Sequence, residues 1–202
     1  YPVTGAEQSD RFYGLRQLKN LGLEVKAIVK TTAWQTAQNL EQVRDKTGVE
    51  FIPVTYKYSN RTLSCREKIN KFFLKIKNPL FLDGAALEYN DPEIKVAVCR
   101  EMEEWKPDFV WFDYTYLWPL YKLVQKYHIP IVTRSINFEP WHFLQEDGYS
   151  VLNLIKSLPK FISEFLILKN SDLIFAITPK EEKIYKKFGG QFVSTLPLRG
   201  LP

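Results

Sequence analysis

The chain has 202 residues and a formal net charge of +5, with 45% hydrophobic and 25% charged residues, and its pI is near 9.0. This composition excludes a disordered or low-complexity chain, and the length suits one α/β domain or two very small ones. Every apolar run is far shorter than the ~20 residues that span a bilayer. The positive charge permits contact with anions such as nucleotides, acidic lipid headgroups or nucleic acid.

The ends of the chain and its cysteines bear on what kind of protein this is. The only methionine is Met102 and the chain opens on Tyr1, where the loop after a first strand should begin, so we expect a segment of a longer protein. Cys65 and Cys99 lack CxxC spacing, which favours reduced thiols, with one disulfide between them as the alternative. Two histidines and two cysteines make a zinc site of the usual Cys/His kind improbable, and we expect no metal.

Helical and strand-like segments alternate from the start of the chain, as they do in α/β folds with a largely parallel sheet. Apolar residues recur at helical spacing over residues 8–21, and Gly22 predicts the end of that helix. The pattern then predicts a strand over 25–29, a helix over 34–46, a strand over 51–54 and a helix over 64–76.

The helix expected over 64–76 is basic and amphipathic. Three lysines interleave there with four apolar residues, namely Lys71, Lys75 and Lys77 with Phe72, Phe73, Leu74 and Ile76. Charged faces opposite apolar stripes are the default for surface helices, so we interpret the lysines as a solvated face without a ligand.

The second half of the chain carries clearer boundary signals. Asp91 and Pro92 predict an N-cap and a first helical position, and Pro107 ends that helix. Thr178 opens a further helix with a capping box, which ends at Gly189. The other predicted elements are strands over 109–112, 129–133, 173–177 and 191–196, and helices over 119–127 and 150–169.

Two of these elements carry further expectations. The strand over 109–112 is continuously apolar, which is typical of a strand covered on both faces. The helix over 150–169 has one apolar side, and Pro159 either kinks or divides it. The residues of that side are Leu154, Leu158, Phe161, Phe165 and Leu168. Together the elements predict a single doubly wound, mostly parallel sheet with helices on both faces.

Several motifs with known chemistry are absent from the sequence. It has no G-x-G-x-x-G, no G-x-x-x-x-G-K-[ST], no G-x-S-x-G and no H-E-x-x-H. Dinucleotide binding, P-loop hydrolysis and an α/β-hydrolase nucleophile therefore lose their main sequence support. The triplet that begins at Asn60 matches a glycosylation sequon, which we attribute to chance.

Ligands of open α/β sheets bind at the carboxyl ends of the strands, and two loops there leave two interpretations open. Thr4 and Gly5 precede the first helix, where they either bring backbone amides to an anion or form a plain turn with Thr4 as cap. Asp113 and Tyr114 follow the strand over 109–112, where they either hold a sugar or, for Asp113, cap the next helix.

The loop after the strand over 129–133 has the densest polar content of any strand end. It carries a cation, an amide, a carboxylate and an imidazole within nine positions, namely Arg134, Asn137, Glu139 and His142. A purely structural turn does not need so many polar groups, so we favour a binding function here. For Thr178 and Pro179, at the end of another strand, helix capping is a sufficient explanation.

These features occur in the same order as in a known protein family. Four stretches resemble, in order, parts of the amino-terminal domain of GT-B-fold glycosyltransferases: PVTGAEQSDRFYGLRQLKNLGLEVKAIV, KPDFVWFDYTYLWPLYKLVQKYHIPIVTRSINFEP, LKNSDLIFAITPKEEKIYKKFGG and VSTLPLRGLP. The first stretch corresponds to the first loop of that domain with its helix and strand, and the second to a strand–helix–strand with an HN-x-E-like motif. The third corresponds to an SxxE-like strand end, and the fourth to the segment that leads into the hinge. The chain is most similar to the retaining glycosyltransferase family four.

This resemblance implies a Rossmann-like domain over 1–196 and the start of an interdomain hinge over 197–202. It implies an enzyme that moves a sugar from a nucleotide sugar, used as a substrate and not as a cofactor, to an acceptor that this half holds. The acceptor is a sugar, a lipid-linked sugar or another glycan. We expect a cytoplasmic protein with peripheral contact to the membrane surface, no nucleic-acid partner, and no activity without the carboxyl-terminal half.

Two departures from the family pattern leave an alternative open. Ala6 follows Gly5 where the family often has paired glycines, and Ile136 stands where the family commonly has histidine. An isoleucine cannot hydrogen-bond a sugar hydroxyl or exchange a proton. The alternative is therefore a non-catalytic α/β module that binds a glycan or a nucleotide. A nucleic-acid protein is a third hypothesis, which rests on the pI alone.

Overall fold

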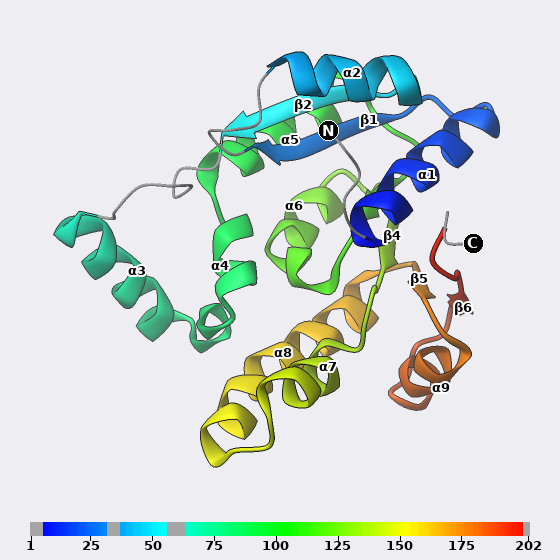
Figure 1. The fold of residues 1–202 in the computed structure, drawn as a ribbon. Coiled ribbons are helices and arrows are strands. Elements are labelled where there is room, and N and C mark those ends of the chain that lie inside the picture. The colour runs from blue at the N-terminus through cyan, green and yellow to red at the C-terminus, as the bar shows by residue number, and fades with distance from the viewer. Residues whose placement is uncertain (1–5, 32–36, 56–63, 200–202) are drawn as a thin grey trace. The chain divides into compact units, whose positions relative to one another are not determined.

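The computed structural model describes residues 6–31, 37–55 and 64–199 (Figure 1). Helices alternate with parallel strands in these ranges, which confirms the α/β class. The strands form two parallel sheets, one of the order β1-β2 and one of the order β3-β4-β5-β6. The structure thus does not show the single sheet that the sequence pattern suggested.

The chain divides into two compact units. We call Tyr1–Leu63 with Leu198–Pro202 the terminal unit and Ser64–Pro197 the central unit. Each sheet lies within one of them, and each unit is described here by itself.

The described residues of the terminal unit form two helices and two parallel strands. They are α1 (Ala6–Asn20), β1 (Lys26–Thr31), α2 (Ala37–Thr47) and β2 (Glu50–Thr55). Gly22 and Gly48, each just beyond a helix, have φ angles of +82° and +69°, a conformation that glycine adopts without strain. Lys26 lies opposite Glu50 in the ladder, with Nζ 3.6 Å from Oε2. The helices and strands expected in this part are confirmed where the structure describes them.

A buried ion pair ties the last described residues of the terminal unit to α1. Asp10 is fully buried, and its carboxylate accepts hydrogen bonds from the backbone N–H and the guanidinium of Arg199. A Cβ at Gly14 would lie 2.0 Å from Nη1 of Arg199. The glycine therefore leaves the space that the guanidinium occupies beside the helix.

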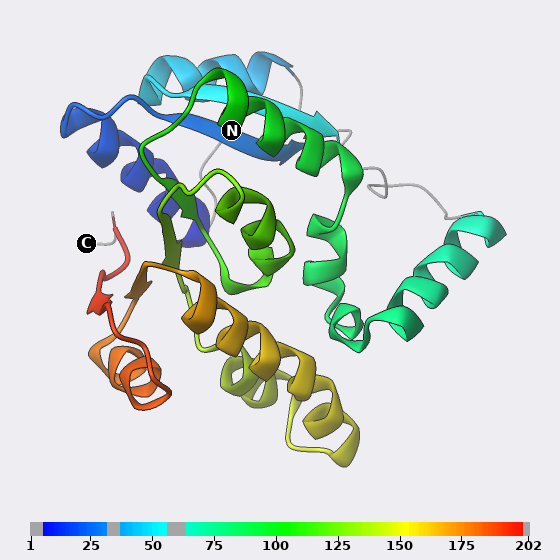
Figure 2. The same cartoon turned by 180° about the vertical axis from the view of Figure 1, so that it is seen from behind.

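The central unit contains the four-stranded sheet and most of the helices. Its elements are α3 (Cys65–Lys77), η1 (Pro79–Leu82), α4 (Gly84–Tyr89), α5 (Pro92–Glu104), β3 (Val110–Phe112), η2 (Thr115–Leu120), α6 (Tyr121–Gln125), β4 (Ile131–Arg134), α7 (Glu139–Asp147), α8 (Val151–Asn170), β5 (Leu173–Ala176), α9 (Pro179–Lys187) and β6 (Val193–Thr195). All neighbouring strands are parallel, so their carboxyl ends share one edge of the sheet. Figures 1 and 2 show α7 and α8 side by side as a helical hairpin.

The core of the central unit forms where strands meet helices. Its largest fully buried apolar and aromatic side chains are Tyr121, Val124, Ile131, Ile167, Ile174 and Tyr185. The Tyr121 hydroxyl lies 2.7 Å from Oγ1 of Thr133, so this buried phenol has a polar partner. Burial raises the pKa of Tyr121 well above its ordinary value.

Three local expectations need correction. The strand over 109–112, expected to be covered on both faces, is covered only in part: β3 is three residues long, and Phe112 is buried whereas Val110 and Trp111 are half-buried. The helix expected over 119–127 instead begins as the 3-10 turn η2, with Pro119 inside it, before α6. Glu139 and His142, expected in a loop, lie in the helix α7.

The long helix α8 is continuous, but it packs on an unexpected side. Pro159 neither ends nor divides it, and the Ser163 hydroxyl donates to the Pro159 carbonyl at 3.0 Å. Leu158 is 57% exposed, whereas Glu164 is only 1% exposed. Part of the apolar side of this helix therefore faces outward, and a polar stripe lies in the core.

The capping box at the start of α9 supports a first prediction. Oγ1 of Thr178 accepts a hydrogen bond from the Glu181 N–H at 3.2 Å, and Oε2 of Glu181 accepts one from the Thr178 N–H at 3.2 Å. We expect Thr178→Ala to lower the free energy of unfolding by about 1 kcal/mol in urea titrations, because an orphan amide loses its partner. Thr178→Ser should keep most of that stability. A loss as large for serine as for alanine would contradict the role of the cap.

Candidate functional site

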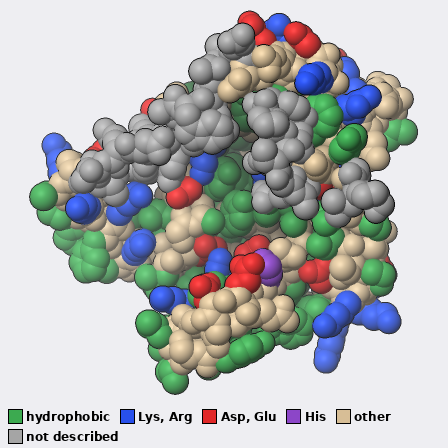
Figure 3. Space-filling view, in the orientation of Figure 1, with side chains coloured by type: hydrophobic (Ala, Val, Ile, Leu, Met, Phe, Trp, Pro, Cys, Tyr) green, Lys and Arg blue, Asp and Glu red, His purple; other side chains and the backbone are tan. Residues whose placement is uncertain are grey.

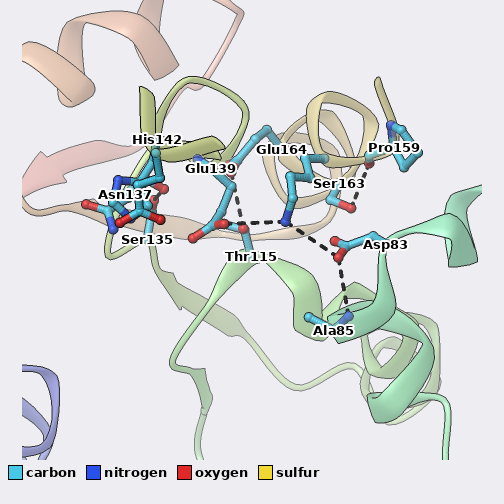
Figure 4. Close-up of polar contacts among 12 residues, drawn as sticks. Asp83, Ala85, Thr115, Ser135, Asn137, Glu139, His142, Pro159, Ser163 and Glu164 are labelled. Carbon is cyan, nitrogen blue, oxygen red and sulfur yellow. Dashed lines mark hydrogen bonds and ion pairs between the residues drawn. The ribbon is translucent and has the colours of Figure 1, made fainter. Parts of the chain in front are cut away.

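The carboxyl edge of the four-stranded sheet leads into a cluster of polar side chains. The loop after β4 runs into α7, and Figure 4 shows Glu139 from its first turn beside Thr115, Glu164 and Asp83. The residues come from four elements, since Thr115 begins η2, Glu164 lies on α8 and Asp83 caps α4. The parallel strands bring the segments after β3 and β4, which lead to Thr115 and Glu139, to one edge of the sheet.

Glu164 is the buried centre of this cluster. Its Oε1 accepts hydrogen bonds from Oγ1 of Thr115 at 3.1 Å and from the Glu139 N–H at 3.2 Å. Its Oε2 lies 2.7 Å from the Tyr185 hydroxyl. A single carboxyl group thus joins η2, α7, α8 and α9.

Burial raises the pKa of Glu164 to about 8, and the nearby charge of Glu139 acts in the same direction. Hydrogen bonds from Tyr185, from the Glu139 backbone and from Thr115 offset part of that rise. At neutral pH the group is therefore largely a neutral carboxylic acid, which is able to donate as well as accept.

The hydrogen-bond pattern around Tyr185 agrees with a protonated Glu164. The Tyr185 hydroxyl has one proton and lies 2.7 Å from both Oγ of Ser135 and Oε2 of Glu164. Ser135 donates its own proton to the Asn137 carbonyl at 2.8 Å. The single Tyr185 proton cannot serve both contacts at once, so a proton on Glu164 satisfies the contact between them whenever Tyr185 donates to Ser135. This chain of bonds fixes the loop that carries Asn137 and Glu139.

Beside Glu164 lies an ion-pair bridge in which Lys160 and Glu139 are partly exposed and Asp83 is buried. Nζ of Lys160 lies 3.6 Å from Oδ1 of Asp83 and 3.7 Å from Oε2 of Glu139. The Glu139 side chain is 20% exposed. Burial raises its pKa, whereas the charges of Lys160 and His142 lower it and the charge of Asp83 raises it further. Glu139 is therefore a partly desolvated carboxylate that a cation holds in place.

His142 lies one turn after Glu139 on α7. Its Nε2 is 3.3 Å from Oε1 of Glu146, and its side chain is 39% exposed. Asn137 is half-buried at the end of the preceding loop. The structure thus brings Asn137, Glu139 and His142 to one place, as Figure 4 shows.

Other residues singled out from the sequence make contacts within the protein that explain their presence without a ligand. Arg134 is fully buried, and its Nη2 donates to the Pro197 carbonyl at 3.4 Å. Tyr114 is buried and its ring stacks on Tyr116 with a centroid separation of 4.6 Å. The N-cap of η2 is Tyr114, so Asp113 does not cap that helix; its Oδ1 accepts a hydrogen bond from Nε1 of Trp111 at 3.2 Å.

Two further positions bear on the resemblance. Thr4 and Gly5 lie outside the residues that the structure describes. Ile136 is buried, with 8% of its surface exposed. Its side chain therefore contributes to packing, and this position offers no group to a ligand.

Sequence reasoning missed Asp83, Lys160 and Glu164, which complete the cluster. Only Glu164 left a signal, as an acidic residue between the apolar residues Phe161 and Leu168 of an amphipathic helix. Glu181 was interpreted only as part of a capping box. In addition, its Oε1 accepts a hydrogen bond from the Phe138 N–H at 3.0 Å, which ties α9 to the loop before α7.

An apolar cavity of about 550 Å³ lies between α7 and α8. Its lining includes Trp141, Leu144, Tyr149, Leu154, Leu158 and Phe161. Figure 3 shows acidic side chains, a histidine and a basic side chain gathered around the same two helices. The hairpin therefore presents a polar cluster and an apolar hollow close together.

The described ranges contain neither a metal-binding cluster nor a membrane-spanning helix. Among these residues, no group of three or more His, Cys, Asp or Glu side chains could hold a metal ion. No helix in this part of the chain has the length and apolar character needed to cross a membrane. Cys65 and Cys99 are both free thiols.

Comparison with known proteins adds no family assignment. No protein-family model matches the chain, and no curated protein sequence matches it significantly.

Proposed function

We propose that this chain is the amino-terminal, Rossmann-like half of a GT-B glycosyltransferase, and that its central unit holds the sugar acceptor. The observation that carries the proposal is the Glu139–Lys160–Asp83 bridge at the carboxyl edge of a parallel sheet. The resemblance of four stretches, in order, to retaining glycosyltransferase family four supports it. The finer part of the proposal is that both parallel sheets belong to one doubly wound Rossmann-like arrangement.

The chemistry of the cluster suits a polyhydroxylated ligand. Carboxylates accept hydrogen bonds from sugar hydroxyls, and charge-assisted bonds of this kind are about twice as strong as neutral ones. The partly exposed Glu139 supplies the acceptors, and Lys160 supplies donors and limits the repulsion between Glu139 and the buried Asp83. The nucleotide sugar is a substrate, which the resemblance assigns mainly to the other half of such an enzyme.

The apolar cavity narrows the acceptor to a lipid-linked sugar or glycan. It lies between the helix that carries Glu139 and the helix that carries Lys160. An apolar hollow of this size binds hydrocarbon more readily than sugar. In this arrangement the sugar end of the acceptor contacts the polar cluster and part of its lipid enters the cavity.

Acceptor binding by the chain tests the proposal. We expect a short-chain glycolipid to bind more tightly than its free sugar headgroup and than an alkyl chain without sugar, as titration calorimetry measures. Trp141 lines the cavity, so its fluorescence reports entry of the lipid. Equal affinity for the alkyl chain and the glycolipid, or binding to neither, would overturn the proposed acceptor site.

One observation favours the alternative of a non-catalytic binding module. Ile136 is buried where the resembled family commonly has histidine, so no imidazole is available from that position. This alternative predicts the same glycolipid binding but no sugar transfer from any nucleotide sugar. An assay of sugar transfer therefore distinguishes the two hypotheses, whereas an assay of glycolipid binding does not.

A further inference from the structure

Helix α3 exposes the side that an amphipathic helix ordinarily buries. Its exposed fractions are 53% for Ile69, 61% for Phe72, 54% for Phe73 and 58% for Ile76. These residues follow the spacing i, i+3, i+4 and i+7, which places them in one stripe along the helix. No residue of α3 is buried. The lysines of α3 are exposed or partly exposed, as a solvated face would be, but the apolar stripe is exposed as well.

The opposite side of α3 is polar and partly covered. Glu67 and Lys71 lie there and are half-buried. Phe72 and Phe73 contact each other edge to face, with ring centroids 6.1 Å apart. The helix thus presents contiguous apolar and aromatic surface to the outside, a feature that marks an interaction site.

Basic side chains border the stripe along both edges. At 100° per residue, Arg66 and Lys77 fall on one flank, and Lys68 and Lys75 on the other. The helix has five basic residues and one acidic residue. Figure 3 shows basic and hydrophobic side chains together over α3.

We propose that α3 docks the central unit on an anionic lipid surface, lying in the plane of the interface. The stripe enters the boundary between headgroups and acyl chains, and the flanking Lys and Arg contact lipid phosphates. Charge complementarity selects this occupant, because a second copy would bring two strongly basic helices together. The inference goes beyond the proposed function and does not depend on it.

Vesicle binding by the full chain tests this inference. The chain should co-sediment with vesicles of phosphatidylcholine mixed with phosphatidylglycerol and not with vesicles of phosphatidylcholine alone. Binding should weaken as salt is raised, because ions screen the lipid charge. An environment-sensitive fluorophore on the exposed thiol of Cys65, at the edge of the stripe, should shift its emission to the blue on binding.

Substitutions on α3 distinguish the contribution of its basic residues to vesicle binding from the contribution of its apolar stripe. Each lysine near an anionic surface contributes about fivefold to binding, so the double change Lys68→Gln and Lys75→Gln should weaken it about thirtyfold. Phe72→Ser with Phe73→Ser should weaken it at least tenfold. Because Lys68, Phe72 and Phe73 are exposed and Lys75 is partly exposed, circular dichroism should show unchanged folding.

Matched controls lie elsewhere on the central unit. Lys183→Gln with Lys187→Gln removes two exposed lysines from α9, and Phe192→Ser removes a phenylalanine that is 68% exposed. None of these changes should affect vesicle binding.

Three results would overturn the inference. The first is the absence of binding to the anionic vesicles, and the second is binding that the α3 and control variants reduce equally. The third is a concentration-dependent dimer that Phe72→Ser with Phe73→Ser abolishes, since a second copy would then cover the stripe.

Discussion

At pH 8, Glu164→Gln is expected to raise the free energy of unfolding by about 4 kcal/mol. The pKa of Glu164 is about 8 in the folded chain, against an ordinary value of 4.5. The unfolded chain therefore loses this proton above about pH 4.5, while the folded chain keeps it up to about pH 8. Stability falls as pH rises between these values, because the folded state binds more protons there. Glutamine has no proton to lose, so the variant escapes this loss.

Glutamine also preserves the contacts that a neutral Glu164 makes. Its amide oxygen accepts from Thr115 and from the Glu139 N–H, and its amide N–H donates to Tyr185. At pH 5 the two proteins should therefore agree within about 1 kcal/mol. Urea unfolding at a series of pH values, followed by tryptophan fluorescence, measures the difference in the free energy of unfolding between the two proteins at pH 8 and at pH 5. Parallel pH dependence in the two proteins would refute a buried, protonated Glu164.

Alanine at the same position should lower the free energy of unfolding even at pH 5. It leaves the Thr115 hydroxyl, the Glu139 N–H and the Tyr185 hydroxyl short of a partner. Each such loss costs about 1 to 3 kcal/mol, so we expect a total of about 4 kcal/mol. The contrast between glutamine and alanine separates loss of the hydrogen bonds from loss of the charge.

The second large effect concerns acceptor binding. Glu139→Gln should weaken glycolipid affinity about thirtyfold, since a hydrogen bond to a charged carboxylate contributes about 2 kcal/mol. Asp147→Asn is the matched control, because Asp147 is an exposed acidic residue at the end of the same helix. Calorimetric titration of both variants with one glycolipid measures the difference. Equal losses in the two variants would show that Glu139 has no special role.

Lys160→Met should move the pH dependence of acceptor binding. The charge of Lys160 lowers the pKa of Glu139, so its removal raises that pKa. Binding that needs the Glu139 carboxylate is present above this pKa and is lost as pH falls through it. The loss should therefore begin at higher pH in the variant, and not in Lys156→Met, which removes an exposed lysine one turn earlier on α8. An unchanged midpoint would indicate that Glu139 does not bind the acceptor as a carboxylate.

Local signals predicted the boundaries of many elements well. Asp91 and Pro92 begin α5 as expected, with Oδ1 of Asp91 accepting from the Glu93 N–H at 2.8 Å. The capping box at Thr178 is confirmed in the same way. Such signals involve contacts within three or four residues, so the sequence alone contains them.

The start of α7 left a weaker local signal. Pro140 occupies its first turn and Gly148, with a φ of +87°, ends it. Phe138 makes no side-chain capping bond, so the usual polar cap was missing. The segment was therefore interpreted as a loop, although proline at the start and glycine at the end are typical of a helix.

The side on which a helix packs depends on partners that periodicity does not identify. Helical spacing found the apolar stripes of α3 and α8 but not their outward position. Glu164 became recognisable as a central residue only through Thr115 and Tyr185, which lie 49 and 21 residues away in the sequence. The candidate site could thus be predicted at Glu139 and His142 but not across the α7–α8 hairpin.

Sugar transfer by the natural protein that contains this chain tests the central claim most directly. A panel of labelled nucleotide sugars would be incubated with the protein and a glycolipid that the chain binds, and labelled lipid would be measured. The account predicts transfer from at least one donor, strongly reduced by Glu139→Gln and retained by Asp147→Asn. Glycolipid binding with no transfer and no hydrolysis of any donor would contradict it and would favour the non-catalytic binding module.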